Sequence, residues 1–166
     1  MKALCFSSTG LLAVGSKMVS IYGPTYSKVQ DLTEHTGYVL ALAFSASGNN
    51  LVSGGVDTKI QIYEKEGAQF KHLITLSSHY NHISSLFFFK ESLISGSTDK
   101  NINLYENFVH VHSITYDISV QTLTCNESVL VCGLLYGVIA TFDNNLVKKT
   151  SWVAHKGWVK ALAFAN

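Results

Sequence analysis

The chain has 166 residues, of which 47% are apolar and 14% are charged, and its formal net charge is +1. This composition excludes an intrinsically disordered chain, and so small a charge, without a Lys or Arg cluster, argues against nucleic acid or anionic lipid as a partner. No run reaches the roughly 18 apolar residues of a membrane helix, so we expect no membrane insertion.

Short apolar runs of strand length recur along the chain. They begin at residues 1, 39, 83, 120 and 159, so the spacings are 38, 44, 37 and 39 residues. A recurrence of about 40 residues is typical of a modular array of repeats. The chain is therefore predicted to hold four whole units and the opening of a fifth, whose first strand would cover Val159–Phe164.

Each unit is predicted to contain about four strands. Apolar residues flank one polar residue in Val19-Ser20-Ile21, Ile60-Gln61-Ile62 and Ile102-Asn103-Leu104, and this alternation is typical of a strand with one face more buried. Clusters such as Ser47–Asn50 separate the runs, as tight turns between antiparallel strands require. Such a small sheet cannot bury both faces unless a neighbouring unit stacks on it.

Position within the unit predicts the place of each strand. Val39–Phe44 and Ile83–Phe88 open their units and are expected to be innermost, while Phe70–Leu76 and Phe108–Ile114 close theirs and are expected to be outermost. No segment sustains a helical period of three to four residues. We therefore expect no helix longer than about two turns between residues 39 and 114.

One segment recurs nearly position by position. Ser53–Tyr63 (SGGVDTKIQIY) returns as Ser95–Tyr105 (SGSTDKNINLY), with small, acidic, β-branched and aromatic positions in the same order. Upstream, each segment is preceded by a His and by an apolar first strand, which ends in Phe44-Ser45 in the second unit. These features resemble the WD40 repeat, whose pattern runs from a His through a strand ending in Phe-Ser to a small-Gly-small-x-Asp turn.

The resemblance implies an all-β, WD40-type β-propeller. About four blades plus the first strand of a fifth are expected, as part of a larger propeller, and residues 1–166 are taken as one WD40 repeat domain. Tyr22, Tyr63, Tyr105 and Phe142 stand where the family most often has Trp. The change retains an aromatic ring but loses the indole donor.

The resemblance also implies a buried hydrogen-bonded network in two units. Its predicted members are His35, Ser53, Asp57 and Tyr63 in the second unit and His79, Ser95, Asp99 and Tyr105 in the third. In the first and fourth units, Val14 and Cys132 replace the Ser, and Tyr136 replaces the Asp. Those two units are expected to depend mainly on apolar packing.

The favoured function is a non-catalytic protein-protein interaction scaffold within a larger complex. In the family, residues beside the first-strand Val or Ile and just before the turn Asp lie on the face most used for partners. Here these positions are Tyr38, Leu40, Val56, His82, Ser84, Thr98, Trp158 and Lys160. Aromatic, basic and small polar residues suit a peptide or protein loop, although Leu40 and Val56 are as readily explained as packing of the channel.

The alternative function is a propeller-fold enzyme or metal-dependent hydrolase with acidic and His residues lining the channel. No Gly-x-Ser-x-Gly elbow, phosphate loop or His-Glu-x-x-His motif is present. Asp57 and Asp99 recur once per unit, which is typical of scaffold residues. His110 and His112 share a predicted strand face, but no third ligand is indicated. We expect no enzyme activity, no bound metal and no cofactor.

The three cysteines of the chain give information on the cellular compartment of the protein. Cys5, Cys125 and Cys132 have no metal-ligand spacing, and an odd number does not form a disulfide framework. We expect them to act as small apolar residues. The protein is predicted to be intracellular, with the cytoplasm favoured and the nucleus as the alternative. Unpaired end units would further permit self-association or completion by another propeller segment.

Overall fold

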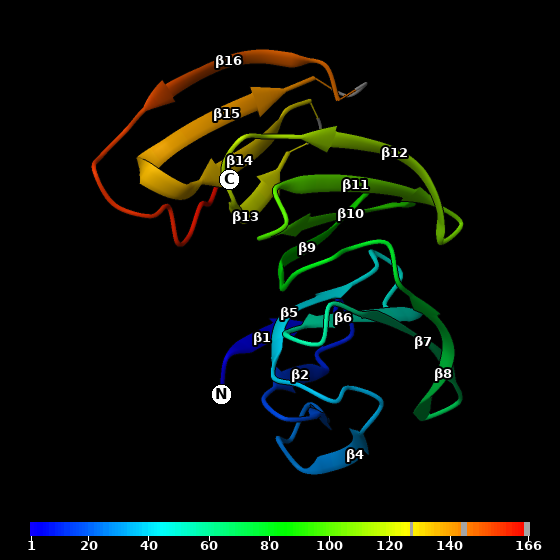
Figure 1. The fold of residues 1–166 in the computed structure, drawn as a ribbon. Helices are drawn as coiled ribbons and strands as arrows, with labels where there is room; N and C mark the ends of the chain where they lie inside the picture. Colours follow the sequence, from blue (N-terminus) through cyan, green and yellow to red (C-terminus); the bar gives the residue numbers. More distant parts are fainter. Residues whose placement is uncertain (127, 144–145, 165–166) are drawn as a thin grey trace.

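The computed structural model describes residues 1–126, 128–143 and 146–164; the rest of the predicted 1–166 domain lies outside the described residues. Within them, four antiparallel sheets of four strands correspond to the four predicted units. In every sheet the strands pair in chain order. The sheets succeed one another as blades around a common centre (Figure 1). The predicted all-β architecture of about four blades is confirmed.

The bounds of the strands follow the predicted repeat register. The first two sheets contain β1 (Ala3–Phe6), β2 (Leu12–Gly15), β3 (Val19–Tyr22), β4 (Lys28–Leu32), β5 (Val39–Phe44), β6 (Asn50–Gly55), β7 (Ile60–Glu66) and β8 (Gln69–Leu76). The last two contain β9 (Ile83–Phe89), β10 (Ser92–Ser97), β11 (Asn101–Glu106), β12 (Val109–Thr115), β13 (Val120–Cys125), β14 (Leu130–Leu134), β15 (Val138–Phe142) and β16 (Lys148–Val153). A single 3₁₀ turn, η1 (Leu135–Gly137), joins β14 to β15.

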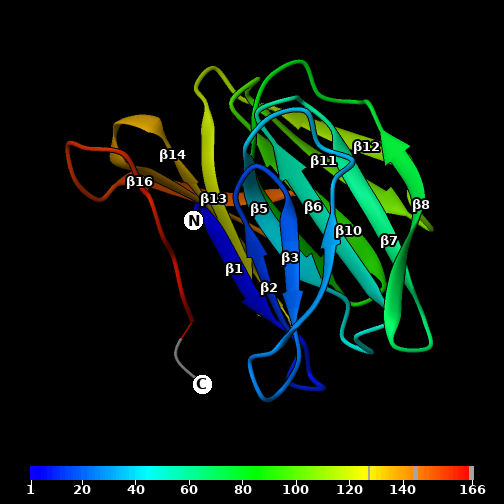
Figure 2. The ribbon, with the colours of Figure 1, turned by 90° about the horizontal axis from the view of Figure 1, so that it is seen from below.

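The opening strands of the units form the inner side of the fan. β1 contacts β5, β5 contacts β9, and β9 contacts β13, and Figure 2 shows β1, β5 and β13 running in similar directions. The predicted innermost strands are therefore correct, with β5 matching its predicted bounds and β9 one residue longer. No helix interrupts residues 39–114, as predicted.

The hydrophobic core lies between successive sheets. One cluster of buried side chains joins the first and second sheets, a second joins the second and third, and a third joins the third and fourth. None of these clusters joins the fourth sheet to the first within the described residues. Each blade is thus stabilised by its neighbours in the chain, as expected for stacked repeats.

A glycine in the second strand of each blade sets the distance to the next blade. A Cβ built on these glycines would lie within 3.0 Å of a β-branched side chain of the following unit, in the pairs Gly15–Val39, Gly54–Ile83, Gly96–Val120 and Gly133–Val159. Real Cβ atoms essentially never approach this closely. All four β-branched side chains are buried. The absence of a side chain at these glycines therefore leaves space for the β-branched side chain that opens the next unit.

The predicted fifth strand is wrong. Residues 159–164 form no strand, because a strand requires a hydrogen-bonded neighbour and no strand among the described residues pairs with this segment. Its first residue is nevertheless docked: the N–H of Val159 lies 3.4 Å from the carbonyl oxygen of Leu134, and that of Val39 lies 2.7 Å from the equivalent oxygen of Ser16. Among the described residues, no helix has the length and apolar character needed to cross a membrane.

Candidate partner-binding face and its supporting networks

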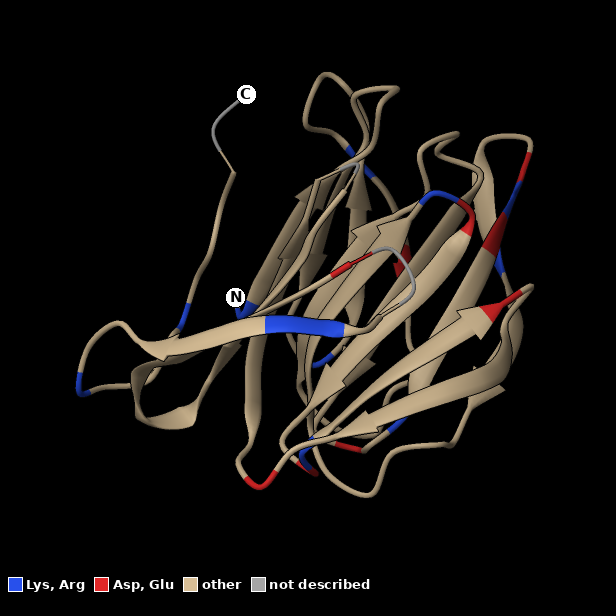
Figure 3. Ribbon diagram, turned by 90° about the horizontal axis from the view of Figure 1, so that it is seen from above, with Lys and Arg blue, Asp and Glu red and all other residues tan. Residues whose placement is uncertain are grey.

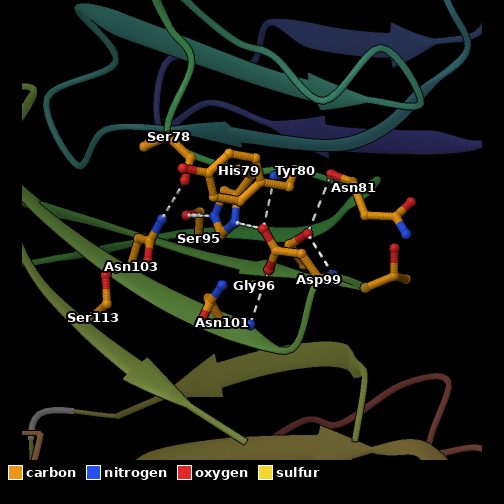
Figure 4. A network of polar contacts seen from close by, with 12 residues as sticks. Ser78, His79, Tyr80, Asn81, Ser95, Gly96, Asp99, Asn101, Asn103 and Ser113 are labelled. Carbon is orange, nitrogen blue, oxygen red and sulfur yellow. Dashed lines mark hydrogen bonds and ion pairs between the residues drawn. The ribbon is translucent and has the colours of Figure 1, made fainter.

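The third blade contains a hydrogen-bonded network around His79 (Figure 4). Nδ1 of His79 lies 2.8 Å from Oδ2 of Asp99, and Nε2 lies 2.6 Å from Oγ of Ser95. The same carboxylate accepts the backbone N–H groups of Tyr80 and Asn101, each at 2.9 Å. The network therefore fixes the loop before β9 to the turn between β10 and β11.

Tyr105 joins the network of the third blade. Its hydroxyl lies 3.3 Å from Oγ of Ser95 and 2.6 Å from Oγ of Ser78, and Nδ2 of Asn103 donates to it at 3.3 Å. Tyrosine thus supplies, through a hydroxyl, a polar group at the position where the family most often has the indole donor of Trp.

The second blade repeats this arrangement with a different partner for its Tyr. His35 lies 2.8 Å from Oδ2 of Asp57 through Nδ1 and 2.7 Å from Oγ of Ser53 through Nε2. The hydroxyl of Tyr63, however, donates to Oε2 of Glu34 at 3.0 Å. Glu34 and Ser78 each directly precede the His of their network, so the two Tyr hydroxyls meet different residues at the same position of the unit.

Burial and hydrogen bonding both shift the pKa values of Asp99 and His79. Burial acts to raise the pKa of Asp99, but the N–H groups of Tyr80 and Asn101 and the imidazole of His79 outweigh it, so this pKa is lowered. Burial lowers the pKa of His79 despite Asp99. The carboxylate only accepts, so the proton of neutral His79 is on Nδ1, and the Ser95 hydroxyl donates to Nε2.

The fourth blade lacks the network. Cys132 is fully buried at the Ser position, and burial raises the pKa of its thiol. Tyr136, at the Asp position, is exposed and has a left-handed backbone with φ of 59°. Tyr116 stands four residues before β13, where His35 and His79 precede β5 and β9. Its buried hydroxyl has no hydrogen-bond partner among the described residues.

One cavity gathers most of the predicted partner-binding face. Its volume is about 600 Å³, and six of the eight predicted residues line it: Leu40, His82, Ser84, Thr98, Trp158 and Lys160. They come from the second, third and fifth units, at the ends of the strands that surround the centre of the fan. We call this hollow the mouth cavity, with a lining completed by Lys2, Ser119, Gln121 and Leu135.

The four additional lining residues obey the same positional rule. Lys2 and Gln121 are the second residues of the opening runs in units one and four, as Leu40 and Ser84 are in units two and three. Ser119 precedes its first strand, and Leu135 occupies the turn position of Thr98. Sequence reasoning missed them because the first and fourth units match the repeat pattern poorly, although the register was available.

Tyr38 and Val56 lie outside the lining of the mouth cavity. The carbonyl oxygen of Tyr38 accepts the N–H of Val56 at 2.9 Å, so the two are neighbours. The Tyr38 ring is connected to the cavity by Lys2, whose Nζ lies 5.9 Å from the ring centroid. Leu40 is half-buried and contributes to the lining.

Hydrogen bonds within the lining hold its polar residues in place. Oγ of Ser84 donates to the carbonyl oxygens of Gly96 at 3.0 Å and Val120 at 2.8 Å, and Oγ of Ser119 donates to the carbonyl oxygen of Thr98 at 3.0 Å. These bonds connect the third and fourth blades at the cavity. The hydroxyl groups of Ser84 and Ser119 are therefore tied to backbone carbonyl groups at the cavity.

The histidines and cysteines form no metal site in the part of the chain that is described. No group of three or more His, Cys, Asp or Glu side chains is arranged to hold a metal ion there. Nε2 of His110 lies 2.8 Å from Oγ of Ser113. Burial raises the pKa of Cys5 to about 12 and that of Cys125 to about 11, so neither thiol is activated.

A second cavity lies at the opposite ends of the strands. Its volume is about 470 Å³, and its lining combines Phe87–Lys90 with Cys125 and Asn126. Lys90 is the only charged side chain in this lining. The mouth cavity is larger and more varied in chemistry, which makes it the stronger candidate for a recognition site.

Comparisons with known proteins agree with the geometry. The family model described as "WD domain, G-beta repeat" matches residues 26–64 and 70–106. Elongator complex protein 2 of Danio rerio is 24% identical over 183 aligned positions, which cover 95% of this chain and 22% of that protein. Protein HIR1 of Phaeosphaeria nodorum is 26% identical over 172 positions, which cover 82% of this chain and 16% of that protein.

Solved structures share the fold at low sequence identity. The crystal structure of the RRP9 WD40 repeats matches with a TM-score of 0.85 and 20% identity, over 95% of this chain and 52% of that chain. The computationally designed Ika8 protein matches with a TM-score of 0.84 and 23% identity, over 99% and 52%. The chain thus spans about a fifth of its matched relatives' length and about half of each matched structure.

Proposed function

Since two segments of this chain match the WD40 repeat model, we propose that it is a non-catalytic protein-interaction scaffold. In this proposal the mouth cavity and the adjoining Tyr38 form one face that binds a protein or peptide partner. The observation that carries it is the gathering of six predicted residues from three units around a single cavity. An exposed Trp beside polar and apolar groups is typical of a binding hot spot.

We further propose that the protein acts inside an assembly. One relative is named Elongator complex protein 2, which supports this role. Exposed apolar residues on the end sheets support self-association or completion by another propeller segment, because stacking of repeats would bury them. The three free thiols favour a reducing compartment, in agreement with an intracellular protein.

The two tryptophans of the chain provide a matched test. Trp158 lines the mouth cavity and is 56% exposed, whereas Trp152 lies on the outer strand β16 and is 47% exposed. The partner would be recovered by cross-linking to the full protein, purified, and titrated against both variants by calorimetry. We expect Trp158→Ala to weaken binding by about 2 kcal/mol or more, as for an aromatic anchor.

Trp152→Ala should leave this affinity unchanged, because its side chain lies away from the proposed face. Thermal unfolding of both variants would verify that each remains folded. Equal affinities of wild type and Trp158→Ala for the purified partner would overturn the proposed face. A loss confined to Trp152→Ala would place the interface on the outer strands instead.

A further inference from the structure

The mouth cavity carries charge of one sign. Lys2 and Lys160 are its cationic side chains, and no Asp or Glu belongs to the lining. In Figure 3 a blue segment lies beside the N-terminus and another on the segment leading to the C-terminus, with no red segment between them. The net charge of the whole chain is only +1, so this local excess is not a general basic character.

Neighbouring carboxylates do not neutralise these lysines. Asp99 follows Thr98 in the chain, but its oxygens are bound to His79 and to two backbone N–H groups. Asp117 precedes Ser119 by two residues, yet it is exposed and lies outside the lining. Within residues 1–126, 128–143 and 146–164, neither Lys2 nor Lys160 makes a salt bridge.

Aromatic rings hold both ammonium groups without removing their charge. Nζ of Lys160 lies 4.1 Å from the centroid of the Trp158 ring and 3.4 Å from Oε1 of Gln121. Nζ of Lys2 lies 5.9 Å from the centroid of the Tyr38 ring. Cation–π contacts of this kind position a cation while leaving its other N–H donors free. Both lysines can therefore donate to an incoming anion.

The segment that provides Trp158 and Lys160 is positioned by the residue between them. The buried side chain of Val159 packs against Gly133, and its N–H points to the carbonyl oxygen of Leu134. Although this segment forms no strand, the anchor places an aromatic and a cationic side chain at the rim of the cavity. The apolar side chains of Leu40 and Leu135 complete the same lining.

We propose that the mouth cavity binds Asp or Glu side chains of an extended segment in a protein partner. This inference rests on the proposed function and adds the chemistry of the partner. The carboxylates pair with the ammonium groups of Lys2 and Lys160, while an apolar side chain of the same segment packs on Trp158. We commit to carboxylates because each ammonium group is a single point charge that one carboxylate balances, and the chain contains no Arg that would add a planar fork.

The test is a selection of binders from a library of random 12-residue peptides against the whole chain. We expect the recovered peptides to be enriched in Asp and Glu, and their affinity to fall as salt is raised, since exposed charge pairs are screened. Lys160→Gln and Lys2→Gln should each weaken a selected peptide about fivefold. Lys156→Gln, on the same segment but outside the lining, should leave the affinity unchanged, and circular dichroism would verify the fold of each variant.

Each alternative result has its own meaning. Peptides that require Trp158 but show no acidic enrichment would overturn the charge inference and leave the proposed function standing. Peptides that bind equally well to wild type, Trp158→Ala and Lys160→Gln would overturn both. A selected peptide that binds more tightly when phosphoserine replaces its key Asp would overturn the choice of carboxylate over phosphate.

Discussion

Asp99 connects three parts of its blade through one carboxylate. It holds the imidazole of His79, the backbone before β9, and the backbone that enters β11. Because the side chain of His79 is buried, removal of this carboxylate would leave several donors without partners. Each such group costs about 1–3 kcal/mol. The stability of the third blade thus depends strongly on a single residue.

Asp99→Ala is therefore expected to lower the free energy of unfolding by about 2 kcal/mol or more. Glu91→Ala is the control, since Glu91 is exposed in the turn between β9 and β10. Chemical unfolding followed by circular dichroism measures both. Equal unfolding midpoints for the two variants would contradict the role assigned to the network.

Stability should also fall on acidification, in two ranges of pH. Burial lowers the pKa of His79 below its ordinary 6.5, so below about pH 6.5 the unfolded state binds more protons and folding weakens as pH falls. The pKa values of Asp57 and Asp99 are lowered from 3.8. Their contribution is present above that value and is lost as pH falls through the folded-state pKa.

Urea unfolding at about pH 7.5, 5.5 and 3.5 would measure this decline. Asp117→Asn, which removes an exposed carboxylate, should show the same profile as wild type. A free energy of unfolding that stays constant between pH 7.5 and 3.5 would contradict the assigned charge states.

Among the elements, the second strand of each blade controls how the sheets stack. Gly15, Gly54, Gly96 and Gly133 each face the first β-branched residue of the next unit, which explains why a small residue recurs there. Side chains larger than hydrogen would push the following blade away. The spacing of the blades therefore depends on four backbone positions without side chains.

Gly96→Ala is expected to lower the free energy of unfolding by about 1–3 kcal/mol, as overpacking of a tight interior does. Gly23→Ala is the matched control, because its new methyl group would lie 3.6 Å from Cγ2 of Val29, an ordinary contact. Thermal unfolding compares the two variants. If Gly96→Ala is as stable as Gly23→Ala, the proposed limit on blade spacing is wrong.

For the whole molecule, the two end sheets differ from the inner ones. Leu4 and Phe6 on β1 are 52% and 57% exposed, and Phe164, in the segment that follows β16, is 37% exposed. No core cluster covers them from the other end of the fan within the described residues. Exposed apolar faces of stacked repeats favour association or fraying.

The 166-residue chain is therefore expected not to behave as a closed monomeric disc. Light scattering should detect a dimer or larger species, or hydrogen exchange should show rapid exchange confined to the two end sheets. The inner strands β5 and β9 serve as the internal control and should exchange slowly. A compact monomer with even protection from Leu4 to Phe164 would contradict this prediction.

The sequence by itself determined the repeat register and hence the fold. Each of the four sheets follows from the alternation of apolar and polar residues, from the turn residues and from the spacing of the repeats, which are local properties of the chain. The 3₁₀ turn was not predicted. The positions of the network and face residues follow from the same register. Even the missed Lys2 and Leu135 obey it, because identical positions in successive blades arrive at the same end of the fan.

Only the tertiary structure decided the features that depend on neighbours distant in the chain. Folding brings together the residues that form these features. They are the hydrogen bond from Tyr63 to Glu34, the surroundings of the Tyr116 hydroxyl, which has no partner among the described residues, and the two lysines that line one cavity. The fifth unit is the clearest case. Val159–Phe164 has the pattern of a strand, but the pattern alone cannot supply a hydrogen-bonded neighbour. Among the described residues, the backbone of Val159 is docked on Leu134 and no strand forms over residues 159–164.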